Sequence, residues 1–104
     1  MTNEEKNNIT YGHSSTTNGC AGNTGSVPRL NFPGLCLHDN QNGIRSADMT
    51  NAYPAGVHTG ASWNRNLTQD RGRQIGAEFR RKGINVALGP AAGPLGRVAK
   101  GGRN

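Results

Sequence analysis

The stretch "NRNLTQDRGRQIGAEFRRKG", Asn64–Gly83, and the "INVALGP" that follows it, residues 84–90, decide the fold class. The opening asparagine is a good N-cap, and the closing glycine suits the left-handed residue that ends many helices. Between them Leu67, Ile75 and Phe79 lie on one helical row. Four apolar residues in five positions then run into Gly-Pro, which is typical of a buried parallel strand. The stretch therefore predicts a helix that leads into a strand.

Upstream segments supply the rest of a small α/β arrangement. "TNEEKNNI" predicts a short helix with a capping box between Thr2 and Glu5. Residues 12–34 are almost all turn formers and are predicted to be a long ordered loop. "LCL", residues 35–37, and "AGVHTGASW", residues 55–63, are predicted strands. Strand, helix and strand make one βαβ unit with open sheet edges, so residues 1–104 are predicted to be an incomplete piece of a larger α/β fold.

Composition limits the core and the classes of partner. Only 32% of the 104 residues are hydrophobic and 16 are glycine, so the chain can bury little apolar surface. The net charge of +6 is scattered apart from the Arg80–Lys82 run and the C-terminal tail, and no dedicated nucleic-acid partner is predicted. An apolar run long enough for a membrane span is absent, and Met1 leads directly into polar residues without a signal peptide.

Two cysteines, Cys20 and Cys36, leave two interpretations open. They are either two buried thiols or a disulfide that closes the loop between them. Their spacing fits no zinc pattern, and the histidines are too dispersed for a metal site. Two sequons begin at Asn8 and Asn66 and favour a secreted protein.

The chemistry of the chain concentrates at Asp39, directly after the first predicted strand. Polar residues at the carboxyl ends of parallel strands form the sites of such folds. Arg45 follows six residues later, and Arg103 lies in the tail after the second strand. An aspartate flanked by arginines suits a neutral polyol, since the carboxylate accepts and the guanidinium donates hydrogen bonds. A structural ion pair between Asp39 and Arg45 explains the residues equally well.

Several long words of the sequence carry a resemblance to a known family. They are "GCAGNTGSVPRLNFPGLCLHD", "NGIRSADMTNAYPAGVHTGASWNRNL", "GAEFRRKGINVALGPAAGPLGR" and "GGRN". Together they resemble the N-terminal domain of fungal β-glucosidases of glycoside hydrolase family 3, over essentially all of the chain. The resemblance implies a TIM-like barrel, of which residues 1–104 are the N-terminal piece, completed by the remainder of the parent enzyme.

The family's function gives expectations for this chain. Its members are secreted, retaining hydrolases that release terminal β-D-glucose from cellobiose and other β-glucosides without a cofactor. The resemblance implies that Asp39, Arg45 and Arg103 contact the glucose of the −1 subsite. It also implies a Cys20–Cys36 disulfide.

The chain departs from the family's words at two places. Where relatives read "LQDGPLG", "LQDSPLG" or "LQDAGNG", this chain reads "LHDNQNG", so His38 and Asn40 change the flanks of the sugar-binding aspartate. The family's nucleophilic Asp and acid/base Glu lie in words that follow "GGRN", so the chain alone is predicted to be inactive. The alternative function is a non-catalytic module, derived from the family, that binds a sugar or a partner protein.

Overall fold

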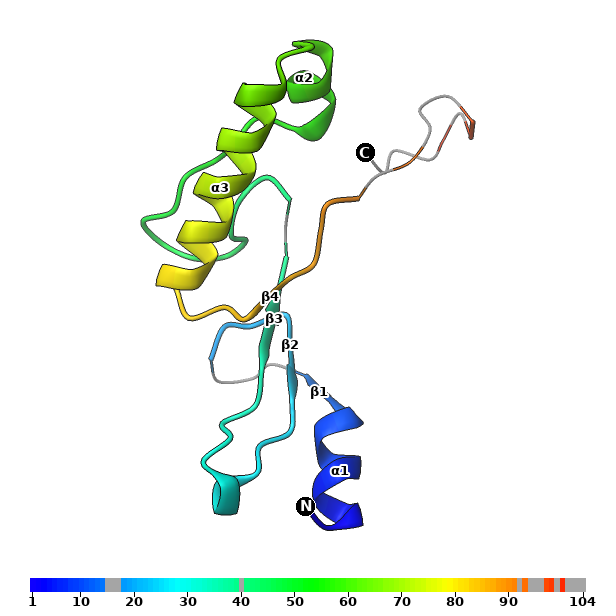
Figure 1. Cartoon of the computed structure of the whole chain (residues 1–104), viewed down its shortest axis with the longest axis vertical. Helices are drawn as coiled ribbons and strands as arrows, with labels where there is room; N and C mark the ends of the chain where they lie inside the picture. Colours follow the sequence, from blue (N-terminus) through cyan, green and yellow to red (C-terminus); the bar gives the residue numbers. More distant parts are fainter. Residues whose placement is uncertain (15–17, 40, 92, 94–96, 99, 101–104) are drawn as a thin grey trace.

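A computed structural model gives the fold of the chain and describes residues 1–14, 18–39, 41–91, 93, 97, 98 and 100. Four strands form one sheet in the order β1-β2-β3-β4, with three helices and one 3₁₀ turn around it (Figure 1). The elements in chain order are α1 (Asn3–Thr10), β1 (Gly12–Ser14), β2 (Gly22–Thr24), η1 (Pro28–Leu30), β3 (Cys36–His38), α2 (Gly56–Ala61), α3 (Arg65–Arg81) and β4 (Val86–Ala87).

Helix α1 begins with the predicted capping box. The Thr2 hydroxyl accepts from the Glu5 backbone N–H at 3.2 Å, and the Glu5 carboxylate accepts from the Thr2 N–H at 2.7 Å. Arg29 in η1 donates two further bonds of 2.9 Å to that carboxylate. The hydrogen bonds from Arg29 and from the Thr2 backbone lower the pKa of Glu5 from 4.5 to about 2. One carboxylate thus caps α1 and ties it to the following loop.

The stability that Glu5 contributes is therefore expected to depend on acid pH. Because the folded-state pKa lies below the ordinary one, the contribution is complete above about pH 4.5 and disappears as the pH falls toward about 2. Glu5→Gln keeps a capping acceptor but removes the charge, so urea unfolding of the two proteins should differ at neutral pH and converge in acid. The control, Glu4→Gln, removes the same charge from the same turn and should have a smaller effect. A Glu5→Gln difference that stays constant across this pH range would contradict the assignment.

The described residues of the predicted loop, 12–14 and 18–34, are ordered, but they are not all loop. Strands β1 and β2 pair antiparallel within it, from Gly12 opposite Thr24 to Ser14 opposite Gly22. Val27 is only 1% exposed and bridges to Phe32. The prediction missed the hairpin because glycine, serine and threonine carry no strand pattern, and pairing with β3 supplies the order instead.

Strand β3 is where the two halves of the sheet join. It pairs antiparallel with β2 and parallel with β4, with Leu37 opposite Val86 and His38 opposite Ala87. The parallel arrangement on which the sequence-based site depended is present between β3 and β4, so the chain leaves both strands at the same end of the sheet. The crossover between them contains α2 and α3, and α2 lies at the opposite end of the molecule from α1 (Figure 1).

The prediction of a strand at residues 55–63 is wrong, because this segment forms helix α2. The N–H and the hydroxyl of Thr59 both bond to the Ala55 carbonyl, at 3.2 and 3.3 Å. Thr59 is buried, and α2 packs against α3. Small residues have weak preferences for either structure, so contact with α3 decides between them. The strand that opens the βαβ unit is consequently β3.

Helix α3 forms as predicted. The Asn64 side chain accepts from the Leu67 N–H at 3.1 Å, and Gly83 has a φ of +79°. Along the predicted apolar row, Phe79 is buried at 3% exposure but Leu67 is 50% exposed. The helix therefore buries its C-terminal half and leaves its N-terminal half open.

The core is as small as the composition predicts. The buried hydrophobic side chains of the described residues are Cys20, Val27, Ile44 and Phe79. The radius of gyration is 16.6 Å, whereas a compact domain of this length has about 13 Å. The described residues form a mixed α/β unit with one βαβ crossover, and the TIM-like barrel stays a prediction.

Candidate functional site

Asp39 and Arg45 meet at the carboxyl end of β3. The Arg45 N–H donates to the Asp39 carbonyl oxygen at 3.2 Å, which closes the intervening loop. The Arg45 guanidinium Nη2 lies 3.1 Å from Asp39 Oδ2. The ion pair that the sequence allowed is therefore present.

The pair is exposed enough to bind something else. The Asp39 side chain is 34% exposed and that of Arg45 is 60% exposed. Ion pairs this open contribute about 0–1 kcal/mol, so stability alone is a weak reason for the arrangement. A carboxylate has about four acceptor positions and a guanidinium five N–H donors, and the contact between Oδ2 and Nη2 uses only one of each. An ion pair and a polyol site are thus compatible here.

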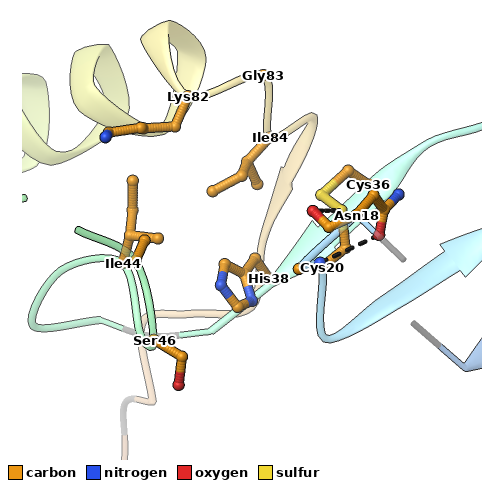
Figure 2. A pocket seen from close by; sticks show the side chains of 11 residues that line it. Asn18, Cys20, Cys36, His38, Ile44, Ser46, Lys82, Gly83 and Ile84 are labelled. Atoms are coloured by element: carbon orange, nitrogen blue, oxygen red, sulfur yellow. Dashed lines mark hydrogen bonds between the residues drawn. A yellow bond between two sulfur atoms is a disulfide. The ribbon is translucent and has the colours of Figure 1, made fainter. Parts of the chain in front are cut away.

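His38 is the last residue of β3, next to Asp39 in the chain, and is 5% exposed. Its Nδ1 faces the Ala21 N–H at 3.1 Å and its Nε2 faces the Arg45 carbonyl oxygen at 2.9 Å. A backbone N–H can only donate and a carbonyl can only accept, so both bonds form in the neutral ring that carries its hydrogen on Nε2. Figure 2 shows the ring among Cys20, Ile44 and Ser46, beside a cavity of about 420 Å³. Neither Asp39 nor Arg45 lines this cavity.

Side chains of α3 hold the loop that carries Arg45. Arg71 donates to the Gln41 carbonyl at 2.7 Å and to the Pro54 carbonyl at 2.8 Å, near the two ends of the loop. The side chain of Gln41 in turn accepts from the Ala91 N–H at 2.8 Å. The chain that follows β4 thus passes beside the loop that follows β3, close to Asp39.

Glu78 and Lys82 hold the middle of the same loop. Glu78 is 4% exposed, and its Oε1 accepts from both the backbone N–H and the side-chain amide of Asn51, at 3.0 and 2.9 Å. The Lys82 ammonium donates to the Asp48 carbonyl at 2.8 Å. These contacts were not predicted, because their partners are mostly backbone atoms. The spacing of residues 71 and 78 on one face of α3, with Lys82 at its C-cap, is the signal that could have found them.

The remaining predicted residues stand as follows. Cys20 and Cys36 form the disulfide, with their Cα atoms 5.6 Å apart, so the interpretation as free thiols is excluded. Asn66 is exposed in the first turn of α3, whereas the half-buried Asn8 donates its amide to the Ser26 carbonyl at 2.8 Å. Arg103 and Asn40 lie outside the described residues.

The described residues hold neither a metal cluster nor a membrane-spanning helix. No three side chains of the His, Cys, Asp and Glu types lie where they could hold a metal ion in that part of the chain. No helix there combines the length and apolarity that crossing a bilayer requires.

Relatives of known sequence match the chain along its whole length. It is 62% identical over 104 residues to Beta-glucosidase cel3A of Pyricularia oryzae. It is 58% identical over 104 residues to Probable beta-glucosidase M of Aspergillus oryzae. The chain spans 14% and 13% of the length of these two curated relatives. No protein-family model matches it.

Solved structures agree in fold. A glycoside hydrolase family 3 β-glucosidase from Neurospora crassa superposes with a TM-score of 0.87 at 44% identity, covering 100% of this chain and 12% of that one. β-Glucosidase 3B of Thermotoga neapolitana, solved in complex with glucose, superposes with a TM-score of 0.73 at 32% identity, covering 86% and 15%. By sequence and by fold, the chain belongs to the β-glucosidases of glycoside hydrolase family 3, of which it corresponds to one segment.

Proposed function

We propose that this chain supplies part of the −1 glucose subsite of a secreted, retaining β-glucosidase that acts on cellobiose and other β-glucosides. The observation that carries the proposal is the partly exposed ion pair between Asp39 and Arg45 at the carboxyl end of β3. The glucose-bound structure of the Thermotoga neapolitana relative, which superposes over 86% of the chain, supports it. Arg103, in the word "GGRN", is proposed as a third contact.

The chemistry of the pair suits this role. Asp39 accepts hydrogen bonds from sugar hydroxyls, and its charge makes them stronger than neutral bonds. Arg45 balances that charge and donates to a neighbouring hydroxyl. These groups orient the ring and contribute positioning energy. The nucleophile that forms the glycosyl-enzyme and the acid/base that protonates the leaving oxygen belong, in this proposal, to other parts of the parent enzyme.

Exposed apolar side chains support the need for a larger parent. Trp63 is 93% exposed, Met49 95% and Leu88 46%. Single exposed apolar residues are ordinary, but here they accompany a core of only a few side chains. We propose that the rest of the parent enzyme covers them.

The proposal can be tested in a chimera, in which this chain replaces the matching 104 residues of the Pyricularia oryzae relative. The chimera should hydrolyse an aryl β-glucoside. Asp39→Asn should lower kcat/KM about 100-fold, because two charge-assisted hydrogen bonds of about 1.5 kcal/mol each are weakened. The matched control is Asp70→Asn, which removes an exposed carboxylate paired with Arg73 on α3 and should change kcat/KM less than about twofold.

Two outcomes would overturn the proposal. One is an Asp39→Asn chimera that keeps full kcat/KM. The other is turnover by the isolated chain, which is expected to release no aglycone, if that turnover survives purification and disappears in Asp39→Asn.

The second candidate is a non-catalytic sugar-binding module. The preformed contact between Asp39 and Arg45 within the chain favours it, since binding would need no further ordering of that pair. Glucose-dependent NMR shifts at Asp39 and Arg45 in the isolated chain, without turnover, would support it. Their absence in the presence of an active chimera would leave the enzyme segment as the function.

A further inference from the structure

The backbone of Arg45 is fixed on both sides of its Cα atom. Its N–H donates to the Asp39 carbonyl at 3.2 Å, and its own carbonyl accepts from His38 Nε2 at 2.9 Å. The partner in the first bond, Asp39, directly follows β3, and the partner in the second, His38, is the last residue of β3. An ion pair this exposed stabilises the fold only weakly. The two backbone hydrogen bonds therefore fix the position of the Arg45 backbone, from which the side chain extends.

The imidazole is itself anchored at its other nitrogen. Nδ1 accepts from the Ala21 N–H at 3.1 Å, and Ala21 follows Cys20 of the disulfide. The ring therefore bridges two segments, the disulfide-closed loop and the Arg45 loop, by one acceptor and one donor. A buried group whose two polar atoms are both satisfied has one well-defined orientation.

We propose that His38 is a positioning residue for glucose binding, acting through the Arg45 backbone rather than by touching the sugar. The inference rests on the proposed function of the Asp39–Arg45 pair. The ring lies among Cys20, Ile44 and Ser46, beside a cavity that neither Asp39 nor Arg45 lines (Figure 2). Its donor hydrogen holds the Arg45 carbonyl, and this contact keeps the guanidinium beside the carboxylate.

Glutamine at this position can make the same two contacts. A carboxamide carries one acceptor oxygen and one donor nitrogen on the same carbon, just as the neutral ring carries one of each. The family words "LQD" place glutamine where this chain has His38. Glutamine is accordingly the rescuing variant, and a leucine of similar bulk, which fits beside the 420 Å³ cavity, is the disabling one.

The experiment measures KM, kcat and the melting temperature of the chimera for each variant. His38→Leu should raise the KM for the aryl β-glucoside about tenfold, the equivalent of one hydrogen bond, with a smaller change in kcat. His38→Gln should stay within about twofold of the parent. Val27→Ala, at a fully buried site away from Arg45, should lower the melting temperature without raising KM, which separates positioning from stability.

Each outcome decides the inference. A KM unchanged in His38→Leu, or raised equally in His38→Gln, overturns it. If His38→Leu does not fold, His38→Met replaces it, because the flexible thioether adapts to irregular space. An Asp39→Asn chimera with normal kcat/KM would refute the proposed function itself, whereas a strong Asp39 effect with no His38 effect would refute only the positioning role.

Discussion

Replacing both Cys20 and Cys36 with serine should destabilise the isolated chain by about 3 kcal/mol, the loop-closure effect expected for a bridge across 16 residues. Domains of ordinary stability have only about 5–15 kcal/mol in total. This chain has a handful of buried apolar side chains, so the loss should be a large part of what it has. The free energy of unfolding from urea titration, followed by circular dichroism, measures the effect.

Reductant provides the control for this prediction. It should lower the urea midpoint of the parent chain to that of the double serine variant and leave the variant itself unchanged. A parent midpoint that does not respond to reductant, in a sample shown to be reduced, would contradict the prediction. In that case β2 and β3 would be held by their ladder and by the His38 contact with Ala21 alone.

Helices with local signals could be predicted from the sequence. The capping box of α1 needs only Thr2 and Glu5, and α3 needs only its asparagine cap, its apolar row and its closing Gly83. These contacts span three or four residues, so the pattern of neighbours is sufficient. A parallel strand after α3 was also predictable from its apolar run, but its partner was not, because the strand expected before the helix at residues 55–63 is helix α2 and β3 takes that place.

Elements that depend on distant partners could not be predicted. The hairpin of β1 and β2 consists of glycine, histidine, serine, asparagine and threonine, and it exists because β3 provides an edge to pair with. Helix α2 depends on its contact with α3. Strand assignments in such segments are decided by tertiary structure rather than by intrinsic preference.

The candidate site was predictable in its charged residues but not in its support. Asp39 and Arg45 are recognisable because a strand ends directly before the acid. The sequence left ion pair and polyol site as alternatives; the 3.1 Å contact establishes the ion pair, and the polyol site stays a prediction. Glu78 and Arg71 were not predicted to hold the loop, because they bond mainly to backbone atoms, whose positions no sequence pattern reveals.

Gly43→Ala is expected to be the most damaging single substitution in the Arg45 loop. Gly43 is buried with a φ of +127°, a conformation that side chains rarely adopt. An added Cβ would also overlap the carbonyl oxygen of Asn51, and Glu78 fixes Asn51 by two hydrogen bonds, so the neighbour cannot easily withdraw. Backbone strain and overpacking of about 1–3 kcal/mol each predict a loss of about 3–5 kcal/mol in unfolding free energy.

The matched control for Gly43→Ala is the same substitution at Gly76 on α3. There a Cβ meets nothing within 4 Å and the backbone is helical, so alanine should stabilise the chain by about 0.5–1 kcal/mol. In the chimera, Gly43→Ala should also raise KM. Gly43 lies in the loop between Asp39 and Asn51, which also carries Arg45, so strain there should displace Arg45. If Gly43→Ala and Gly76→Ala shift urea unfolding of the isolated chain alike, the loop is not held by Asn51 and Glu78 as described. If only stability changes and KM does not, Arg45 is held independently of Gly43, through His38 and Asp39 alone.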